Sequence, residues 1–338
     1  ITGLKLKRQS PLAATFNLEL AGGATGYIPP PEQHRLGGYT TWPARTAGLD
    51  EQAEPLIVDT LLGLLENVSK QRRRSIKPSE TSYSKAIAAK SPVAYWRFDD
   101  MSSTRVRDAV GDNHASYQGP VALFLPPSVQ AARPKYEFSN SDAYGNRCVY
   151  LAGGHVQANV SPLGNQYSAV ISFLNTLPAD VRETTGVLFS NESEALVISG
   201  TAAGDDAGKL VFKVGIESFV GKTTIVEGHW NHVAFTRDDD RVCIYLNGRA
   251  EPEIDALIRT TGIAQHWFIG SDGSEATSFD GKVDEVAVFN RVLAGADLAE
   301  LYIHSGFTPP PQPKPSMVLG PKSSHQDSRK QYGDVVRD

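Results

Sequence analysis

Histidine is the residue type in this sequence best suited to bind a metal, but the histidine spacing argues against a metal site. His229 and His232 form the nearest pair, three residues apart. On a helix these two side chains would converge. The apolar alternation around them predicts a strand instead, on which they project from opposite faces. His155 and His266 have no carboxylate neighbour in the sequence. We therefore predict structural roles for the histidines, and packing for His232.

Aspartates gather where strands are expected to begin or end, at Asp99-Asp100, Asp238-Asp239-Asp240, Asp280 and Asp284. Carboxylate oxygens are ligands for calcium, which takes six to eight oxygens, and the sequence alone does not assemble such a set. The three consecutive aspartates fit a solvated hairpin tip. Asp284 and the adjacent Glu285 are expected to anchor a sheet through backbone or arginine contacts.

Motifs for nucleophilic catalysis and for phosphate binding are missing from the sequence. It contains no Gly-x-Ser-x-Gly elbow, no His-Glu-x-x-His and no phosphate loop. Glu251 and Glu253 have the spacing that places two glycosidase carboxylates on one face of a strand. They flank Pro252, which predicts a loop, so this pair does not support a glycosidase.

Composition restricts the partners and the compartment. The formal net charge of the 338 residues is −5, which implies no field for a polyanion, so nucleic acid is not an expected partner. The sequence contains no run of 18 apolar residues, so no membrane-spanning helix is predicted. Cys148 and Cys243 fall in separate expected strands and could be bridged or free, so they do not fix the compartment. The chain starts at Ile1 without a visible signal peptide, and we expect it to be part of a longer polypeptide.

From Val93 onward the pattern is all-β, with short alternating runs separated by Gly, Asp, Asn and Pro. The expected strands are residues 94–98, 121–123, 148–151, 156–158, 169–174, 186–190, 195–199, 209–214, 223–226, 232–236, 242–246, 266–269 and 281–289. About a dozen such strands suit two sheets packed face to face. Residues 83–89 are expected to form one or two helical turns that lead into the first strand. Within the sandwich, helices are expected at residues 178–183 and 293–302.

The apolar patterns of residues 1–70 predict a short α+β segment. Apolar alternation at 3–7 and 14–20 predicts two strands, and 22–31 is too rich in Gly and Pro for a helix. Residues 50–71 predict one amphipathic helix with an apolar stripe at Leu61, Leu64, Leu65 and Val68. Residues 71–84 are expected to be a linker, and the Pro-rich residues 307–338 a disordered tail.

Residues 91–99, 227–249 and 279–291, in this order along the chain, resemble three parts of laminin-G-like, concanavalin A-like jelly-roll modules. Residues 91–99 (SPVAYWRFD) resemble the first strand, residues 227–249 (EGHWNHVAFTRDDDRVCIYLNGR) the central hairpin, and residues 279–291 (FDGKVDEVAVFNR) the last strand. The resemblance implies a mainly β chain with a jelly-roll sandwich over residues 85–306. It also implies a glycan or protein ligand. Some such modules bind calcium at one rim, for which Asp280 is the candidate ligand.

Residues 1–70 resemble the C-terminal end of the catalytic domain in neutral ceramidase-like zinc amidases. The matching positions are Tyr27-Ile28, Glu32 and Gly37-Gly38-Tyr39. The resemblance implies that Tyr27 is a zinc ligand and that Tyr39 polarises the scissile amide carbonyl. The zinc-binding histidines and glutamate of that family lie upstream, so we expect this chain alone to be inactive.

Three functions remain open at this point. The first is an extracytoplasmic accessory module, secreted, periplasmic or on the cell surface, that binds a glycan or an extracellular protein. The second is the C-terminal part of a zinc-dependent amidase. The third is a structural spacer without a ligand. The sequence does not identify the ligand or the oligomeric state.

Overall fold

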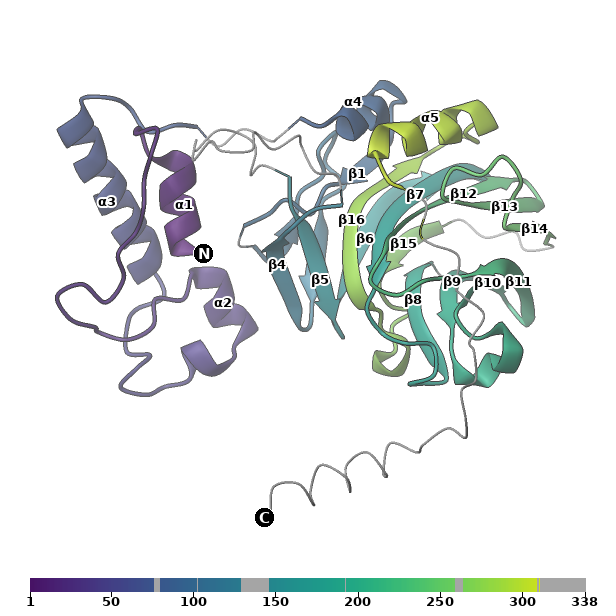
Figure 1. Ribbon diagram of the computed structural model, residues 1–338, viewed down its shortest axis with the longest axis horizontal. Coiled ribbons are helices and arrows are strands. Elements are labelled where there is room, and N and C mark those ends of the chain that lie inside the picture. Colours follow the sequence, from purple (N-terminus) through teal and green to yellow (C-terminus); the bar gives the residue numbers. More distant parts are fainter. Residues whose placement is uncertain are drawn as a thin grey trace, which may run out of the picture.

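The computed structural model describes residues 1–75, 80–101, 103–128, 146–191, 193–258, 264–308 and 310. A helical N-terminal lobe, residues 1–75, lies beside a β-sandwich that carries two helices on one face (Figure 1). The lobe contains α1 (Thr2–Gln9), α2 (Pro31–Leu36), the 3-10 turn η1 (Tyr39–Thr41) and α3 (Ala53–Ser69).

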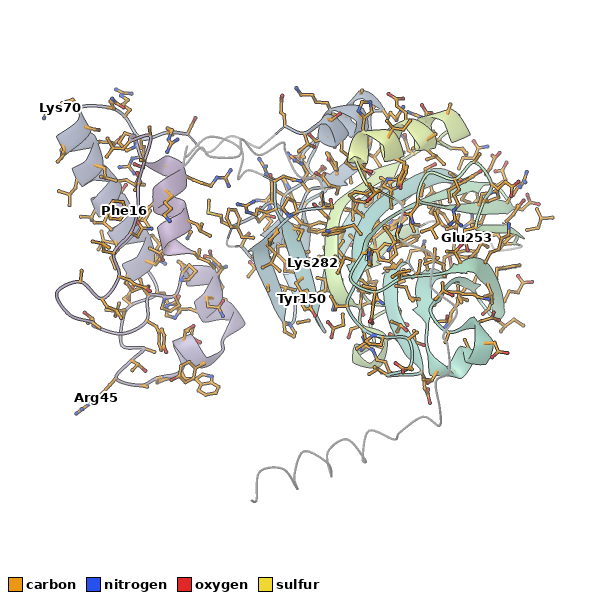
Figure 2. All side chains as sticks on the ribbon, viewed as in Figure 1. Phe16, Arg45, Lys70, Tyr150, Glu253 and Lys282 are labelled. Carbon is orange, nitrogen blue, oxygen red and sulfur yellow. The ribbon has the colours of Figure 1, made fainter. Side chains whose placement is uncertain are left out.

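The predicted strands at 3–7 and 14–20 are wrong. Residues 3–7 lie in α1, which places Leu6 against Val58 and Leu62 of α3. Residues 14–20 form no strand, because no neighbouring strand in the described lobe pairs with them. Figure 2 shows the labelled Phe16 on this lobe, where its side chain is exposed.

The predicted helix at 50–71 is confirmed as α3, and its end is marked by the left-handed residue Lys70. Its buried face differs from the predicted stripe. Val58 and Leu62 are buried, whereas Leu61, Leu64 and Val68 are exposed. A single helix, α1, packs against α3, so only one of its faces is covered.

Two antiparallel sheets, each with eight described strands, form the sandwich. Sheet A has the order β14-β13-β12-β7-β16-β5-β4, and β1 also pairs with β16. Its strands are β1 (Ala94–Trp96), β4 (Val121–Leu125), β5 (Cys148–Ala152), β7 (Gln166–Asn175), β12 (Trp230–Asp238), β13 (Arg241–Leu246), β14 (Ile254–Leu257) and β16 (Asp280–Phe289).

Sheet B has the order β11-β10-β9-β8-β15-β6-β3-β2. Its strands are β2 (Arg105–Val106), β3 (Ala115–Gln118), β6 (His155–Leu163), β8 (Thr184–Ser190), β9 (Glu194–Ser199), β10 (Lys209–Val214), β11 (Glu217–Thr224) and β15 (Ala264–Ile269). The 3-10 turns η3 (Thr201–Asp206) and η4 (Glu275–Thr277) lie against β9 and β8.

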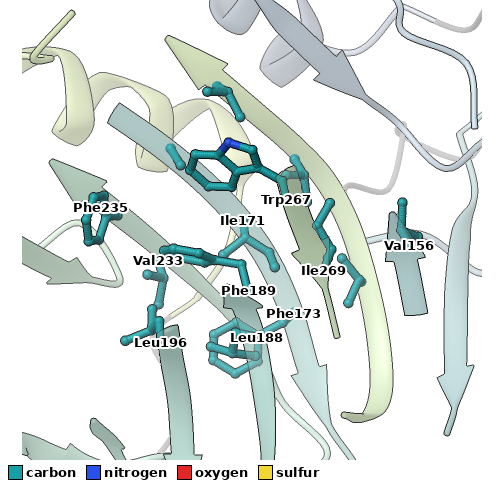
Figure 3. Packing of buried hydrophobic residues seen from close by; sticks show 14 of the residues in the cluster. Val156, Ile171, Phe173, Leu188, Phe189, Leu196, Val233, Phe235, Trp267 and Ile269 are labelled. Atoms are coloured by element: carbon teal, nitrogen blue, oxygen red, sulfur yellow. The ribbon is translucent and has the colours of Figure 1, made fainter. Parts of the chain in front are cut away.

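The inner faces of the two sheets form one large core, part of which is seen in Figure 3. Phe189 of sheet B is central, with ring centroids 5.5 Å from Phe235 and 5.7 Å from Trp267. Burying one such side chain stabilises a fold by roughly 1.5–3 kcal/mol, so this cluster outweighs any single polar contact described below. No residue of the N-terminal lobe belongs to this core.

Two helices cover the outer face of sheet A: α4 (Ser82–Ala89) and α5 (Gly295–Ser305). Tyr83 and Ile87 of α4 pack with Leu298 and Leu301 of α5 over the sheet. Within the described residues, no α-helix covers the outer face of sheet B. The two outer faces of the sandwich therefore differ in their accessibility.

Most of the predicted elements are confirmed. Every predicted strand from 94 to 289 overlaps an observed one, and the helix at 293–302 corresponds to α5. Residues 178–183 form turns and no helix, which corrects the prediction. The helix α4 begins at Ser82, inside the expected linker. The Pro-rich tail from 311 lies outside the described residues.

Candidate functional site

Tyr27 and Tyr39, twelve residues apart in the sequence, lie side by side in the N-terminal lobe. Their ring centroids are 5.6 Å apart, and the ring of Trp42 lies 5.8 Å from that of Tyr39. Both tyrosines are well exposed, Tyr27 at 40% and Tyr39 at 66%. A hydrogen bond with Tyr39 raises the pKa of the Tyr27 hydroxyl. The structure thus brings together the two residues that the ceramidase-like resemblance indicates.

The described residues do not form a zinc site around this pair. Nowhere in the described part of the chain do three or more His, Cys, Asp or Glu side chains gather in a group that could hold a metal ion. Tyr27 would supply one ligand at most, so no step of a metal-dependent reaction follows from these residues.

Asp280, the calcium candidate, lies at the start of β16 and accepts hydrogen bonds from its neighbours. The hydroxyl of Tyr150 donates to Oδ1, and the Thr176 hydroxyl lies 3.2 Å from the same atom. These contacts join β16 to β5 and to the end of β7. No second carboxylate is among the partners of this side chain in the described residues.

Asp284 and Glu285 are fully buried and anchor β16, as the sequence indicated. Asp284 Oδ2 accepts the Ser128 N–H at 2.8 Å and the Ser128 hydroxyl at 2.6 Å. Glu285 accepts the Tyr95 hydroxyl and pairs with Arg97 at 3.5 Å. Burial raises the pKa of both carboxyls, and the charge of Glu285 raises the pKa of Asp284 further. These acids hold β1, β16 and residue 128 together in the interior.

His232, Ser172 and Asp284 are direct register partners across β12, β7 and β16. The residue types match a catalytic triad, but the order does not, because the serine lies between the other two. His232 Nε2 is 2.8 Å from the Tyr83 hydroxyl of α4, and all three residues are buried. Burial lowers the pKa of His232 to about 4. The predicted packing role of His232 is confirmed.

Glu251 and Glu253 do not form a glycosidase pair. Glu253 is buried and accepts the backbone N–H groups of Lys222 and Thr223, whereas Glu251 is exposed. Cys148 and Cys243 are both buried free thiols, so no disulfide joins them.

The outer face of sheet B presents one continuous row of side chains perpendicular to its strands. Direct register pairs link Arg105 to Ser116, Ser116 to Gln157, and Gln157 to Phe268. The same line continues from Phe268 through β8, β9, β10 and β11 at Ser190, Ala195, Lys213 and Ser218. We call these eight residues the cross-strand row.

The accessible part of this surface surrounds Phe268, on strands β2, β3, β6 and β15. We define the sheet-B face as the outward side chains of Arg105, Ser116, Gln118, His155, Gln157, Asn159, His266 and Phe268, all exposed or partly exposed. The rings of His155 and Phe268 lie 5.9 Å apart, and Gln118 Nε2 donates to Ser116 Oγ at 3.0 Å. Burial lowers the pKa of His155, which favours its neutral form. The sheet-B face therefore combines one aromatic ring and the guanidinium of Arg105 with amide, hydroxyl and imidazole groups.

A buried region adjoins the sheet-B face at β8. Ser190 Oγ donates to the Ser271 carbonyl at 2.8 Å, and η4 lies against β8. Next to the cross-strand row, three register-paired valines are buried in a small cluster of their own: Val187, Val197 and Val211. The exposed part of sheet B is thus set off from this apolar patch.

Sequence reasoning identified none of the sheet-B face as a site. Gln157 and Asn159 occupy the polar positions of an alternating strand, as on any sheet with one solvated face. Two signals were available: the half-polar β6 and β15, and an aromatic residue, Phe268, at an outward position.

Residues 152–299, less than half of the chain, match the laminin-G-type family described as the concanavalin A-like lectin/glucanases superfamily. Together with the two antiparallel sheets, this match defines a concanavalin A-like domain, and the predicted fold class is confirmed. No curated protein sequence matches the chain.

Several solved structures are similar to part of this chain. Domain 4 of an extracellular arabinanase from Geobacillus stearothermophilus, in complex with arabinotriose, has 18% identity and a TM-score of 0.41, with 62% of this chain and 98% of that chain covered. The Trypanosoma rangeli sialidase has 11% identity and a TM-score of 0.47, with 74% and 39% covered. The receptor-binding domain of a botulinum neurotoxin C/D mosaic has 12% identity and a TM-score of 0.44, with 63% and 51% covered. This chain therefore spans about two fifths of that sialidase and half of that toxin chain.

Proposed function

We propose that the sandwich is a carbohydrate-binding module that takes its glycan across the sheet-B face and works outside the cytoplasm, secreted or at a cell surface. The observation that carries this proposal is the asymmetry of the sandwich. The outer face of sheet A is covered by α4 and α5, whereas that of sheet B presents the polar side chains around Phe268. The family match to lectins and glucanases supports the same function.

The chemistry of the sheet-B face suits sugars. Gln118, Gln157 and Asn159 each offer amide donors and a carbonyl acceptor, the two kinds of group that pair with sugar hydroxyls. The half-buried Phe268 ring offers an apolar surface for the C–H face of a pyranose, as aromatic side chains do in small-molecule sites. A spacer without a ligand would more naturally fill this surface with large apolar side chains, and Phe268 is the one such residue in the sheet-B face.

The test is a glycan array followed by calorimetry on the best ligand. Gln157→Ala should weaken binding by roughly 5- to 10-fold, since a net hydrogen bond contributes about 1 kcal/mol. The matched control is Gln166→Ala, the same change on sheet A, where the Gln166 amide bonds Asp238 at 2.8 Å. This variant should bind as the unchanged protein does. Equal affinities for both variants, or no glycan bound at all, would remove the proposal and leave a protein partner to be sought.

A second proposal concerns the N-terminal lobe: it forms the end of a ceramidase-like zinc amidase domain within a longer polypeptide. The observation that favours it is the contact between Tyr27 and Tyr39, the two residues that the resemblance places in that site. Many large apolar side chains of the lobe are also exposed, including Phe16, Leu18 and Leu20, which suits a surface covered by further protein.

Hydrolysis of a fluorescent N-acyl sphingosine tests this second proposal. A version extended upstream should cleave the amide with zinc and lose the activity in Tyr27→Phe, whereas this chain alone should be silent. A folded, zinc-loaded extended protein without activity would refute the amidase function and leave the glycan-binding proposal untouched.

A further inference from the structure

Residues 14–20 keep the alternating pattern of a β-strand although no strand of the described lobe pairs with them. The apolar side chains of Phe16 (Figure 2), Leu18 and Leu20 are 76–78% exposed, whereas such an alternating series is ordinarily the buried side of a strand. Residues 15–19 run without a turn or a bend, and the positive φ of Leu20, 57°, ends this straight stretch. The segment has the pattern, the length and the path of a strand that lacks its sheet.

The backbone of this segment is also available for pairing. No N–H or C=O group of residues 14–20 forms a hydrogen bond with another group in the part of the chain that the structure describes. The next backbone hydrogen bond along the chain joins the Tyr27 N–H to the Thr46 carbonyl at 2.7 Å. A row of unpaired backbone donors and acceptors is what the edge of a β-sheet binds.

Polar side chains hold the segment on the lobe from its other side. Thr15 Oγ1 donates to Ser10 Oγ at 2.6 Å, and Asn17 Nδ2 donates to the Gly3 carbonyl at 2.9 Å. Gly3 leaves room for this approach, since a Cβ there would lie 2.4 Å from Asn17 Nδ2. The polar series is thus fixed at α1 and its C-terminal end, whereas the three apolar side chains are left facing solvent.

A second copy of this chain is too small a partner for the segment. Two such segments would form a two-stranded ribbon, which is marginally stable at best in water. The ribbon would bury three large side chains per copy, whereas a stable interface takes about 20–30 residues a side. The partner must supply a sheet of its own, to which the segment adds one strand.

We infer that residues 14–20 form a strand at the edge of a β-sheet in the polypeptide upstream of this chain. In this arrangement Phe16, Leu18 and Leu20 enter the upstream core, and α1 covers the polar face. This inference rests on the second proposal, in that it takes the lobe to be the end of a larger domain, and it names the contact that joins the two parts. Backbone hydrogen bonds supply the affinity, and the alternating side chains set the register.

Amide hydrogen exchange, resolved by residue, tests the pairing in the upstream-extended protein and in this chain. In the extended protein, at least every second amide from Thr15 to Glu19 should exchange roughly 100-fold more slowly than in this chain, because a paired N–H exchanges only when the sheet opens. Leu18→Glu should abolish this protection, since it would bury a charge, whereas Leu18→Val should keep it. Leu257→Glu, the same change at a 70% exposed leucine of the sandwich, is the matched control and should leave the protection unchanged.

The outcomes separate this inference from the amidase proposal. Fast exchange of residues 15–19 in a folded extended protein would overturn the inference, whether or not that protein hydrolyses the N-acyl sphingosine. Slow exchange in an extended protein without hydrolysis would support the pairing and refute the amidase function alone. If this chain by itself sediments as a dimer with residues 15–19 protected, and Leu18→Glu makes it monomeric, the partner is a second copy and the inference is wrong.

Discussion

At the scale of single residues, Asp284 is a fully buried carboxyl whose two oxygens differ in their hydrogen bonding. One carboxyl oxygen accepts two hydrogen bonds from Ser128, whereas the buried Oδ1 has no partner among the described residues. Ser172 Oγ, on the register-paired residue, also lacks one there. Burial raises the Asp284 pKa well above its ordinary value, so the folded state favours the protonated acid.

Asp284→Asn should therefore change how stability depends on pH. The raised folded pKa means that the native state holds its proton longer, so stability falls as pH rises from about 4 towards the folded pKa. Asparagine cannot ionise, and its amide can donate where Oδ1 now has no partner. Relative to the unchanged protein, the variant should gain stability as pH rises from 4.5 to 7.5. Urea unfolding at both pH values measures this, and a pH-independent difference would contradict it.

The buried ion pair between Arg237 and Glu194 supports a second prediction at this scale. Both side chains are almost fully buried, and Glu194 also accepts the Tyr167 hydroxyl at 2.5 Å. Removing one partner leaves an uncompensated charge, so Arg237→Met should cost about 3–5 kcal/mol. The double variant with Glu194→Met should cost less than the sum of the single changes. Additive losses in the double-mutant cycle would show that the pair is not coupled.

At the scale of elements, α4 is attached to sheet A through Tyr83, whose hydroxyl meets His232 in the buried layer. Burial keeps His232 neutral and lowers its pKa to about 4. Because the unfolded chain takes up this proton near pH 6.5, stability should fall as pH drops from about 6.5 to about 4, by up to roughly 3 kcal/mol. His232→Gln should lack this loss. If the variant loses as much stability as the unchanged protein between pH 6.5 and pH 4, the loss is due to groups other than His232.

Elements were predictable from the sequence where alternation coincides with burial. The inner series of β12 and β13, Val233, Phe235, Val242 and Ile244, is apolar and buried, and this hairpin was predicted almost to its ends. The strands β2, β3 and β14 are short and were missed. Residues 14–20 show why alternation alone is insufficient: a strand also needs a partner for its backbone, and the described lobe supplies none.

The candidate site was less predictable, for a physical reason. Which outer face stays open depends on where α4 and α5 dock, and these helices come from the two ends of the domain sequence. The cross-strand row likewise joins residues 105 to 218 through register. The net charge of the chain also does not predict how charge is distributed locally. The formal net charge is −5, yet the described strands of sheet B carry no outward-facing acidic residue. These features follow from long-range pairing, which local patterns do not contain.

At the scale of the whole molecule, the sandwich and the N-terminal lobe have separate cores. The lobe is held by Leu6, Val58 and Leu62, and none of these belongs to the sandwich clusters. A described contact between the two parts is the Arg8 guanidinium over the Phe124 ring at 5.9 Å, between two partly buried side chains. A cation–π contact at an exposed site contributes about 0.5–1 kcal/mol. No helix in the described part of the chain is long and apolar enough to cross a membrane.

Residues 80–310 produced alone should accordingly fold and bind glycan as the full chain does. The thermal midpoint of the sandwich should shift by no more than a few degrees, because neither hydrophobic cluster of the sandwich contains a residue of the lobe. Differential scanning calorimetry compares the two proteins. An unfolded or strongly destabilised sandwich would show that the lobe contributes to its core.

The most direct test of the central claim is backbone amide chemical-shift mapping of the isotope-labelled chain during titration with the best oligosaccharide from the array. We predict that shifts concentrate on β3, β6 and β15, around Gln157 and Phe268, and that strands under α4 and α5 remain unchanged. Shifts confined to the covered face of sheet A or to the N-terminal lobe would contradict the proposed site.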